Sequence, residues 1–185
     1  IFLISDEPYR EIVYDNAEVP CLLKYYKNTI IGYSYSKSLS LPGERIGYLV
    51  VHPEIADFGD VMGSLNVANR ILGFVNAPSL FKRVVAKNLN AEVDVNVYKK
   101  NRDALYNHLV SIGFECVKPQ GAFYLFPRSP IADDKKFCED AKQFNLLLVP
   151  GSAFGCPGHF RLSYCIYYEK IINSLPAFDK LIALY

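Results

Sequence analysis

The chain has 185 residues, of which 51% are hydrophobic and 21% charged, a composition typical of a folded protein with a sizeable core. Twenty lysines and arginines are balanced by 19 aspartates and glutamates, which leaves a formal net charge of +1. This balance gives no electrostatic reason to expect a nucleic acid or an anionic membrane as partner, and it favours a small ligand.

The first third of the chain alternates short apolar runs with turn residues. The runs are 1-IFLIS-5, 29-TIIGYSYS-36 and 46-IGYLVV-51, each long enough for a β-strand. They are almost wholly apolar rather than alternating, which favours strands covered on both faces in a layered α/β unit. Because the first run has no start methionine before it, we expect the chain to begin inside a fold, as a fragment.

Three helical patterns follow. Apolar residues at i, i+3, i+4 and i+7 predict a helix over 54–75 that buries one stripe. A second helix is predicted over 79–89, and a third over 93–112 that ends at Gly113 as a C-cap. The third helix is long and polar on one side, as is typical of a helix that connects two domains.

Beyond this helix the pattern is that of a compact α+β unit. Strands are predicted at 114–119, 122–127, 146–150 and 159–165, and helices at 133–144 and 168–184. No spacer rich in Gly, Ser or Pro separates this part from the first, so we expect the domain boundary inside the long helix. The predicted domains are residues 1–98 and 99–185.

The cysteines and histidines show no pattern of a metal site. The 5 cysteines are odd in number, no Cys-x-x-Cys pair occurs, and the 3 histidines stand singly. No apolar run reaches the roughly 18 residues that a membrane span requires, and no signal segment opens the chain. We therefore expect no metal, no membrane partner and a cytoplasmic location.

The segment 33-YSYSKSLSLPGERIGYLV-50 carries one lysine and one arginine between two predicted strands. The hydroxyls of Ser34 and Ser36 and the guanidinium of Arg45 form a donor set suited to a phosphate. Lys37 could be an ordinary solvated lysine, as an isolated lysine usually is. Beside a phosphate site, however, a lysine is what pyridoxal phosphate requires, because its amine forms a Schiff base with the cofactor aldehyde.

Two residues near the first strand fit the rest of such a site. The pyridine nitrogen of the cofactor stays protonated only beside a carboxylate. Asp6 directly follows the strand 1-IFLIS-5, at the end where ligands of α/β sheets bind, and Tyr9 could reach the phenolic oxygen of the cofactor. Asp6 could equally be a helix N-cap with Pro8 as an early helical residue, and the local sequence leaves both open.

Five segments, taken in order, match one known pattern. They are SDEPY (5–9), SYSKSLSLPGERIG (34–47), GAFYLF (121–126), VPGSAFG (149–155) and HFRLSYC (159–165). The second matches, at every fixed position, the lysine signature of the class I/II pyridoxal-phosphate-dependent aminotransferases. The other four resemble further elements of that family. The chain is identified as a member of this family, of fold type I and aspartate aminotransferase-like, comprising its C-terminal half only.

The resemblance implies an α/β fold. Residues 1–98 would form the C-terminal part of the cofactor-binding large domain, with a mostly parallel sheet and helices, and residues 99–185 the small α+β domain. It also implies pyridoxal 5′-phosphate as cofactor, an α-amino acid and a 2-oxo acid as substrates, and a homodimer of the full-length protein. Because the upstream cofactor contacts are not in this chain, the chain alone is expected to be inactive.

Residue roles follow from the same resemblance. Lys37 would form the Schiff base and move the substrate proton, Asp6 would pair with the pyridinium nitrogen, and Tyr9 would hydrogen-bond the phenolic oxygen. The implied phosphate ligands are Ser34, Ser36 and Arg45.

Arg161 is similar to the family's arginine that binds the substrate α-carboxylate. Its neighbours Phe160 and Leu162 are apolar, and an unpaired guanidinium in such a strand would be costly unless a carboxylate met it. The alternative is a buried ion pair with an acidic residue of the same domain.

Two other functions use the same residues. A pyridoxal-phosphate lyase on this scaffold would steer the reaction to elimination, and an aminotransferase-like sensor domain of a transcriptional regulator would keep the cofactor site without turnover. The amino acid substrate is not specified by the sequence. Phe123, Tyr124 and Phe154 only weakly favour a neutral side chain, because they could also be core residues.

Overall fold

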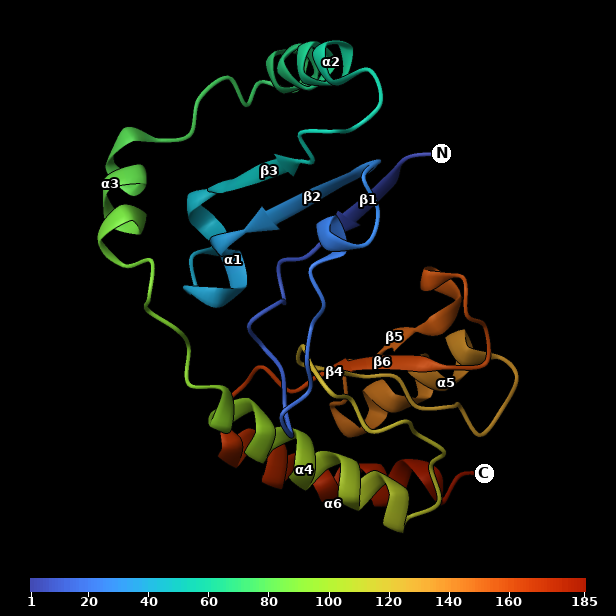
Figure 1. Cartoon of the computed structure of the whole chain (residues 1–185). Helices are drawn as coiled ribbons and strands as arrows, with labels where there is room; N and C mark the ends of the chain where they lie inside the picture. Colours follow the sequence, from blue (N-terminus) through green and yellow to red (C-terminus); the bar gives the residue numbers. More distant parts are fainter. The chain divides into compact units, whose positions relative to one another are not determined.

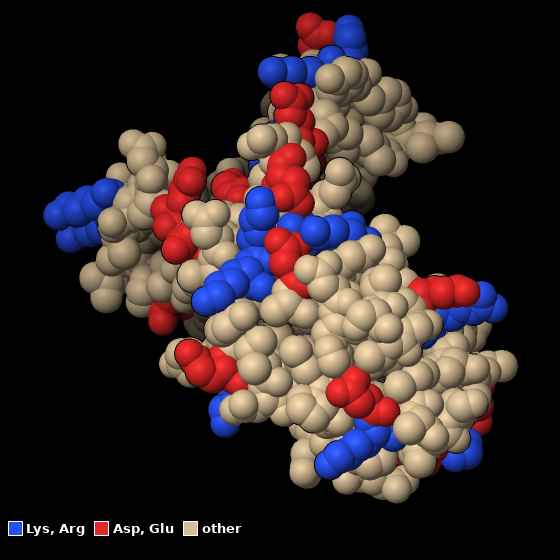
Figure 2. Space-filling view, turned by 90° about the horizontal axis from the view of Figure 1, so that it is seen from below, with Lys and Arg blue, Asp and Glu red and all other residues tan.

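The structure is a computed structural model that describes all 185 residues of the chain. The chain divides into two compact units, Ile1–Val93 and Asp94–Tyr185. Each unit contains a three-stranded sheet with helices (Figure 1). None of the helices combines the length and the apolar composition needed to cross a membrane. Figure 2 shows acidic and basic side chains interspersed on the face drawn, in keeping with the balanced composition.

The sheet of the first unit is mixed. It consists of β1 (Leu3–Asp6), β2 (Thr29–Ser34) and β3 (Gly47–Val51). β1 pairs parallel with β2 and places Asp6 opposite Gly32, whereas β2 pairs antiparallel with β3 and places Ser34 opposite Gly47. Only the first three residues of the central strand β2 are buried. The expectation of strands covered on both faces therefore does not hold within this chain.

The connection from β2 to β3 contains two short helical turns. They are α1 (Tyr35–Ser38) and the 3-10 turn η2 (Pro42–Glu44). The strand predicted to continue to Ser36 stops at Ser34, because the Ser34 side chain accepts a hydrogen bond from the Ser36 N–H and caps α1. Lys37 consequently lies in a helical turn and not at a strand end, which corrects the sequence-based prediction.

The remaining elements of the first unit carry few buried residues. They are the 3-10 turn η1 (Leu22–Lys24), α2 (Phe58–Ile71) and α3 (Ser79–Lys87). The helix predicted over 54–75 begins later, because Asp57 takes a left-handed conformation just before α2. No residue of α2 is buried, and Phe58 and Ile71 are exposed, so the predicted buried stripe is wrong for this chain. No other element of the chain covers that face.

The second unit is an α+β arrangement around a short antiparallel sheet. Its strands are β4 (Tyr124–Leu125), β5 (Val149–Pro150) and β6 (Phe160–Ser163). Its α-helices are α4 (Val95–Ser111), α5 (Asp134–Ala141) and α6 (Tyr168–Ile182). Two 3-10 turns, η3 (Lys142–Phe144) and η4 (Gly151–Phe154), complete the unit. β6 is the central strand, and α4 lies beside α6 (Figure 1). The strand predicted at 114–119 does not form, since that segment joins no sheet.

The core of the second unit is aromatic. The buried Phe160 ring lies between those of Phe137 and Phe114, at centroid distances of 4.9 and 5.5 Å. Cys138 is also buried, and burial raises the pKa of its thiol to about 11, so this cysteine packs in the core as a neutral side chain.

The end of α4 agrees with the sequence. Gly113 has a φ of +100°, which favours glycine. The N–H of Gly113 donates to Val110 and the N–H of Phe114 donates to Leu109, at 3.1 and 3.0 Å, the pair of bonds of a Schellman C-cap. The two units divide at the other end of this helix, between Val93 and Asp94. The assignment of residues 1–98 and 99–185 to two domains stays a prediction.

We predict that Gly47→Ala destabilises the first unit. A Cβ at this position would lie 2.3 Å from the carbonyl oxygen of Tyr33, so β2 and β3 would have to separate. The free energy of unfolding should fall by about 1–3 kcal/mol in chemical denaturation of the full-length protein. Gly43→Ala is the matched control, because a Cβ there meets nothing within 4 Å. Equal stability of the two variants would contradict the close approach.

Candidate functional site

Asp6 lies at the end of β1, beside a glycine of the neighbouring strand. The sheet continues one residue further, since the Glu7 N–H donates to the carbonyl of Gly32 at 2.8 Å. Asp6 is the last residue of a strand and residues 8–11 form turns rather than a helix, so the interpretation of Asp6 as a helix N-cap is wrong. A Cβ on Gly32 would lie 3.9 Å from Oδ1 of Asp6. The missing side chain leaves space next to an exposed carboxylate.

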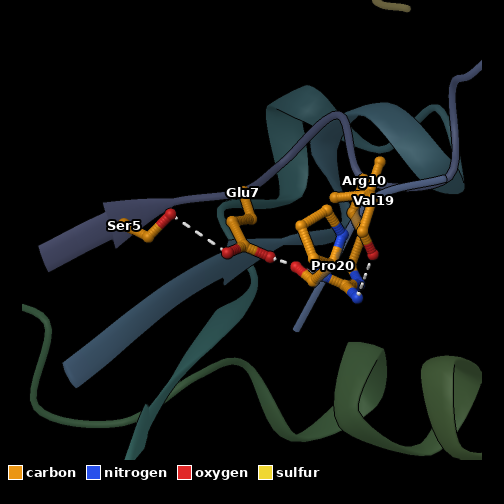
Figure 3. A network of polar contacts seen from close by, with 5 residues as sticks. All are labelled: Ser5, Glu7, Arg10, Val19 and Pro20. Carbon is orange, nitrogen blue, oxygen red and sulfur yellow. Dashed lines mark hydrogen bonds and ion pairs between the residues drawn. The ribbon is translucent and has the colours of Figure 1, made fainter. Parts of the chain in front are cut away.

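A polar network holds the chain around this strand end (Figure 3). Ser5 Oγ donates to Oε1 of Glu7 at 3.0 Å, and Arg10 Nη1 donates to Oε2 of Glu7 at 2.6 Å. Arg10 also donates to the carbonyl oxygens of Val19 and Pro20, at 2.9 and 3.3 Å. Glu7 therefore links β1 to the segment that leads toward β2.

The capped turn α1 places two hydroxyls next to the lysine. The Oγ atoms of Ser34 and Ser36 are 2.6 Å apart, and Ser36 is followed directly by Lys37. The Nζ of Lys37 lies 5.5 Å from the ring centroid of Tyr9. The structure thus brings together the lysine signature and the segment that follows β1.

A tyrosine cluster fixes α1 against the sheet. Tyr33 donates from its hydroxyl to Oγ of buried Ser38 at 2.7 Å, and its ring packs on Tyr35 and Tyr48 at centroid distances of 5.2 and 5.0 Å. Burial raises the pKa of Tyr33 to about 12, so its phenol remains a hydrogen-bond donor at neutral pH. The helical turn that carries Lys37 is held by this bond and these rings.

Arg45 lies where η2 returns the chain to the sheet. It takes a left-handed conformation with φ +51°, and its Nη1 donates to the carbonyl of Pro42 at 2.7 Å. The next residue, Ile46, accepts a hydrogen bond from the N–H of Tyr35 at 3.1 Å. The backbone of Arg45 is therefore adjacent to the start of α1, and its side chain is exposed.

Arg161 belongs to the second unit, whereas the other predicted site residues belong to the first. It lies in the central strand β6, with its guanidinium carbon 4.1 Å from the ring centroid of Phe154 and 4.6 Å from that of Tyr124. Arg161 is partly exposed. Its contacts in the second unit are with aromatic rings, and not with an acidic residue as in the buried ion pair considered above. Its guanidinium thus lies close to the rings of two aromatic residues.

Sequence reasoning missed two features of these surroundings. Tyr124 and Phe154 were considered as pocket lining or core, and their stacking on Arg161 was not foreseen. The pairing of Glu7 with Arg10 was also missed, although their i, i+3 spacing is a recognisable signal. The contact between two rings and one arginine joins three separate segments, so local sequence carries no sign of it.

Comparison with known proteins decides the family. Residues 1–173 match the family described as "Aminotransferase class I and II". The chain belongs to the class I and II aminotransferases. It is 34% identical, over 193 residues, to a probable aspartate/prephenate aminotransferase of Aquifex aeolicus, and the match covers 97% of this chain and 48% of that protein. This aminotransferase chain therefore spans about half the length of the curated relatives it matches.

Solved structures of aminotransferases have the same fold. The crystal structure of an aminotransferase from Eubacterium rectale superposes with a TM-score of 0.96 at 52% identity, covering 100% of this chain and 46% of that one. An aspartate aminotransferase from Thermotoga maritima gives 0.84 at 29% identity, covering 99% and 48%. These likenesses confirm the expected fold type I, and this chain spans a little under half of each of the two solved structures. Members of this family are generally dependent on pyridoxal phosphate.

We predict that Arg10→Ala destabilises the end of β1. The side chains of Arg10 and Glu7 are only 29% and 10% exposed, and the variant leaves the Glu7 carboxylate without this partner. The free energy of unfolding should fall by about 1–2 kcal/mol in chemical denaturation.

Lys27→Ala supplies the control for this variant. It removes an ion pair with Glu54 in which the two side chains are 69% and 62% exposed, and the expected loss is under about 0.5 kcal/mol. If both variants lose the same stability, the network around Glu7 does not hold the strand end.

Proposed function

We propose that the full-length protein containing this chain is a pyridoxal-phosphate-dependent aminotransferase that moves an amino group between an α-amino acid and a 2-oxo acid. The single observation that carries the proposal is the placement of Lys37 directly after the Ser34–Ser36 hydroxyl pair, in the helical turn that follows the central strand. Family membership of the chain supports the same reading. We further propose that residues 1–98 and 99–185 are parts of its large and small domains.

The donor set of this chain fits the cofactor. Two hydroxyls 2.6 Å apart and the exposed guanidinium of Arg45, whose backbone adjoins the same turn, are donors of the kind that binds a phosphate. Asp6 offers an exposed carboxylate at the end of β1, beside Gly32 of the neighbouring strand. Accordingly, Ser34, Ser36 and Arg45 would hold the phosphate, Asp6 the ring nitrogen, Tyr9 the phenolic oxygen and Lys37 the aldehyde carbon.

When bound, the cofactor supplies an electron sink that stabilises negative charge on the substrate α-carbon. Lys37 would take the proton from that carbon and return it, because its flexible stem starts from a turn fixed by the Tyr33 hydrogen bond. Asp6 would keep the ring nitrogen protonated through its negative charge. Tyr9 would orient the phenolic oxygen of the cofactor. Its ring centroid lies 5.5 Å from the Nζ of Lys37.

Arg161 would bind the substrate α-carboxylate. A guanidinium presents parallel N–H donors in its plane, which match the two oxygens of a carboxylate. The guanidinium lies over the rings of Phe154 and Tyr124, which attract the cation but offer its N–H donors no oxygen acceptor, so these donors remain available to a carboxylate.

We also propose a homodimer and a cytoplasmic location for the full-length protein. Exposed apolar side chains such as Phe58, Met62 and Ile71 on α2 support association with further protein surface, because such faces are rarely left open to water.

Lys37→Ala tests the proposed function in the full-length protein. Amino transfer from an amino acid to 2-oxoglutarate should fall to background, about 10⁴-fold or more, because no other amine would attach the cofactor and move the proton. The fold should be unchanged by circular dichroism, and the absorbance of covalently attached cofactor should be lost.

The matched control is Lys24→Ala, which removes an exposed lysine at the end of η1. It should retain full activity and full absorbance. Multiple turnovers of amino transfer by the Lys37→Ala protein would refute the assignment, and release of ammonia or pyruvate without amino transfer by the unaltered protein would replace transferase with lyase.

A further inference from the structure

One of the two aromatic rings next to the Arg161 guanidinium, that of Phe154, comes from a short turn. Phe154 ends η4, a turn of four residues, and its side chain is 47% exposed. Burial in the core therefore does not fix this ring. Its place 4.1 Å from the guanidinium of Arg161 requires that the turn itself be held.

The first residue of this turn is fixed by its own backbone. The N–H of Gly151 donates to the carbonyl of His159 at 2.7 Å, and a Cβ on Gly151 would lie 2.3 Å from the carbonyl oxygen of Cys156. This close approach anchors the start of η4 beside β6. Within the turn, the N–H of Gly155 donates to the carbonyl of Ser152 at 3.2 Å, and the ring of Phe154 packs edge-on against that of Phe126 at 6.1 Å. A further contact acts on Ser152 from outside the turn.

That contact comes from a buried carboxylate. Asp134, the first residue of α5, is 3% exposed, and its Oδ2 accepts a hydrogen bond from the N–H of Ser152 at 2.6 Å. The cap of α5 is a different residue, since Asp133 accepts from the N–H of Lys136. Asp134 is thus not needed to cap its own helix. A buried carboxylate is costly unless hydrogen-bonded, and here the bond is made to the turn that carries Phe154.

We propose that Asp134 is a positioning residue for the substrate carboxylate site. Through the N–H of Ser152 it holds η4 so that the ring of Phe154 stays 4.1 Å from the guanidinium carbon of Arg161. The N–H donors of the guanidinium are then already oriented toward the carboxylate before it binds. Binding does not have to order the arginine side chain each time. This inference rests on the proposed function, because it takes Arg161 as the ligand of that carboxylate.

The test measures binding of 3-phenylpropionate, a carboxylate without an amine, to the full-length protein loaded with pyridoxal phosphate. Asp134→Ala should raise its Kd about tenfold, because the Ser152 N–H loses a charged acceptor. The same variant should raise the KM for the amino acid by a similar factor and leave kcat within about twofold, since the reacting groups lie elsewhere. Asp134→Asn retains an acceptor oxygen and should recover most of the affinity.

Two further proteins separate positioning from a general loss of structure. Glu139→Ala removes an exposed carboxylate from the same helix and should leave Kd unchanged. Phe154→Ala should weaken binding, and adding Asp134→Ala to it should cost nothing more, because both changes remove the same ring contact. Should Asp134→Ala fail to fold, Asp134→Ser, whose hydroxyl is too short to reach Ser152, takes its place in the series.

The results distinguish the two proposals. An unchanged Kd for Arg161→Ala overturns both the role of Arg161 and the inference built on it. A large loss for Arg161→Ala, together with Asp134→Ala binding as well as Glu139→Ala, overturns the role of Asp134 alone. Additive losses in the double variant also overturn it, because Asp134 would then act without Phe154.

Discussion

The hydrogen bond from the Ser36 N–H to the Ser34 hydroxyl determines where Lys37, the proposed Schiff-base lysine, is located. It ends the central strand and starts a single helical turn, so the lysine that follows points from a capped turn and not along a pleated strand. The close pairing of β2 with β3 at Gly47 and the hydrogen bond from Tyr33 to Ser38 both support this turn from the sheet side. A polar segment is held in place here because two side-chain hydrogen bonds and one close backbone approach meet within a few residues.

The sequence allowed prediction of the secondary-structure elements and of the family, but not of the residues at which each element begins and ends. All three strands of the first sheet and the long helix α4 lie where apolar runs and caps indicated. The lysine was expected at a strand end because Tyr33 and Tyr35 continue the apolar pattern of β2. A local bond from a serine side chain overrode that pattern, and such a bond competes with a strand on nearly equal terms.

Burial was the least predictable property. The apolar spacing of α2 is that of a helix with one covered face, and the sequence states nothing about which segment covers it. The same limit applies to Arg161. Its apolar neighbours indicated that leaving its guanidinium unpaired in that strand would cost free energy. Its actual partners, two aromatic rings, come from β4 and η4, and long-range contacts of this kind are set by tertiary packing and not by spacing.

The connections within the first sheet also imply an order of assembly. β2 and β3 are joined through α1 and η2, a local antiparallel hairpin, whereas β1 reaches β2 in parallel only after the intervening segment 7–28 has been closed. Pairing between residues close in sequence costs less loop entropy and forms faster. The turn that carries Lys37 therefore takes shape early in folding, and Asp6 joins it in a later, slower step.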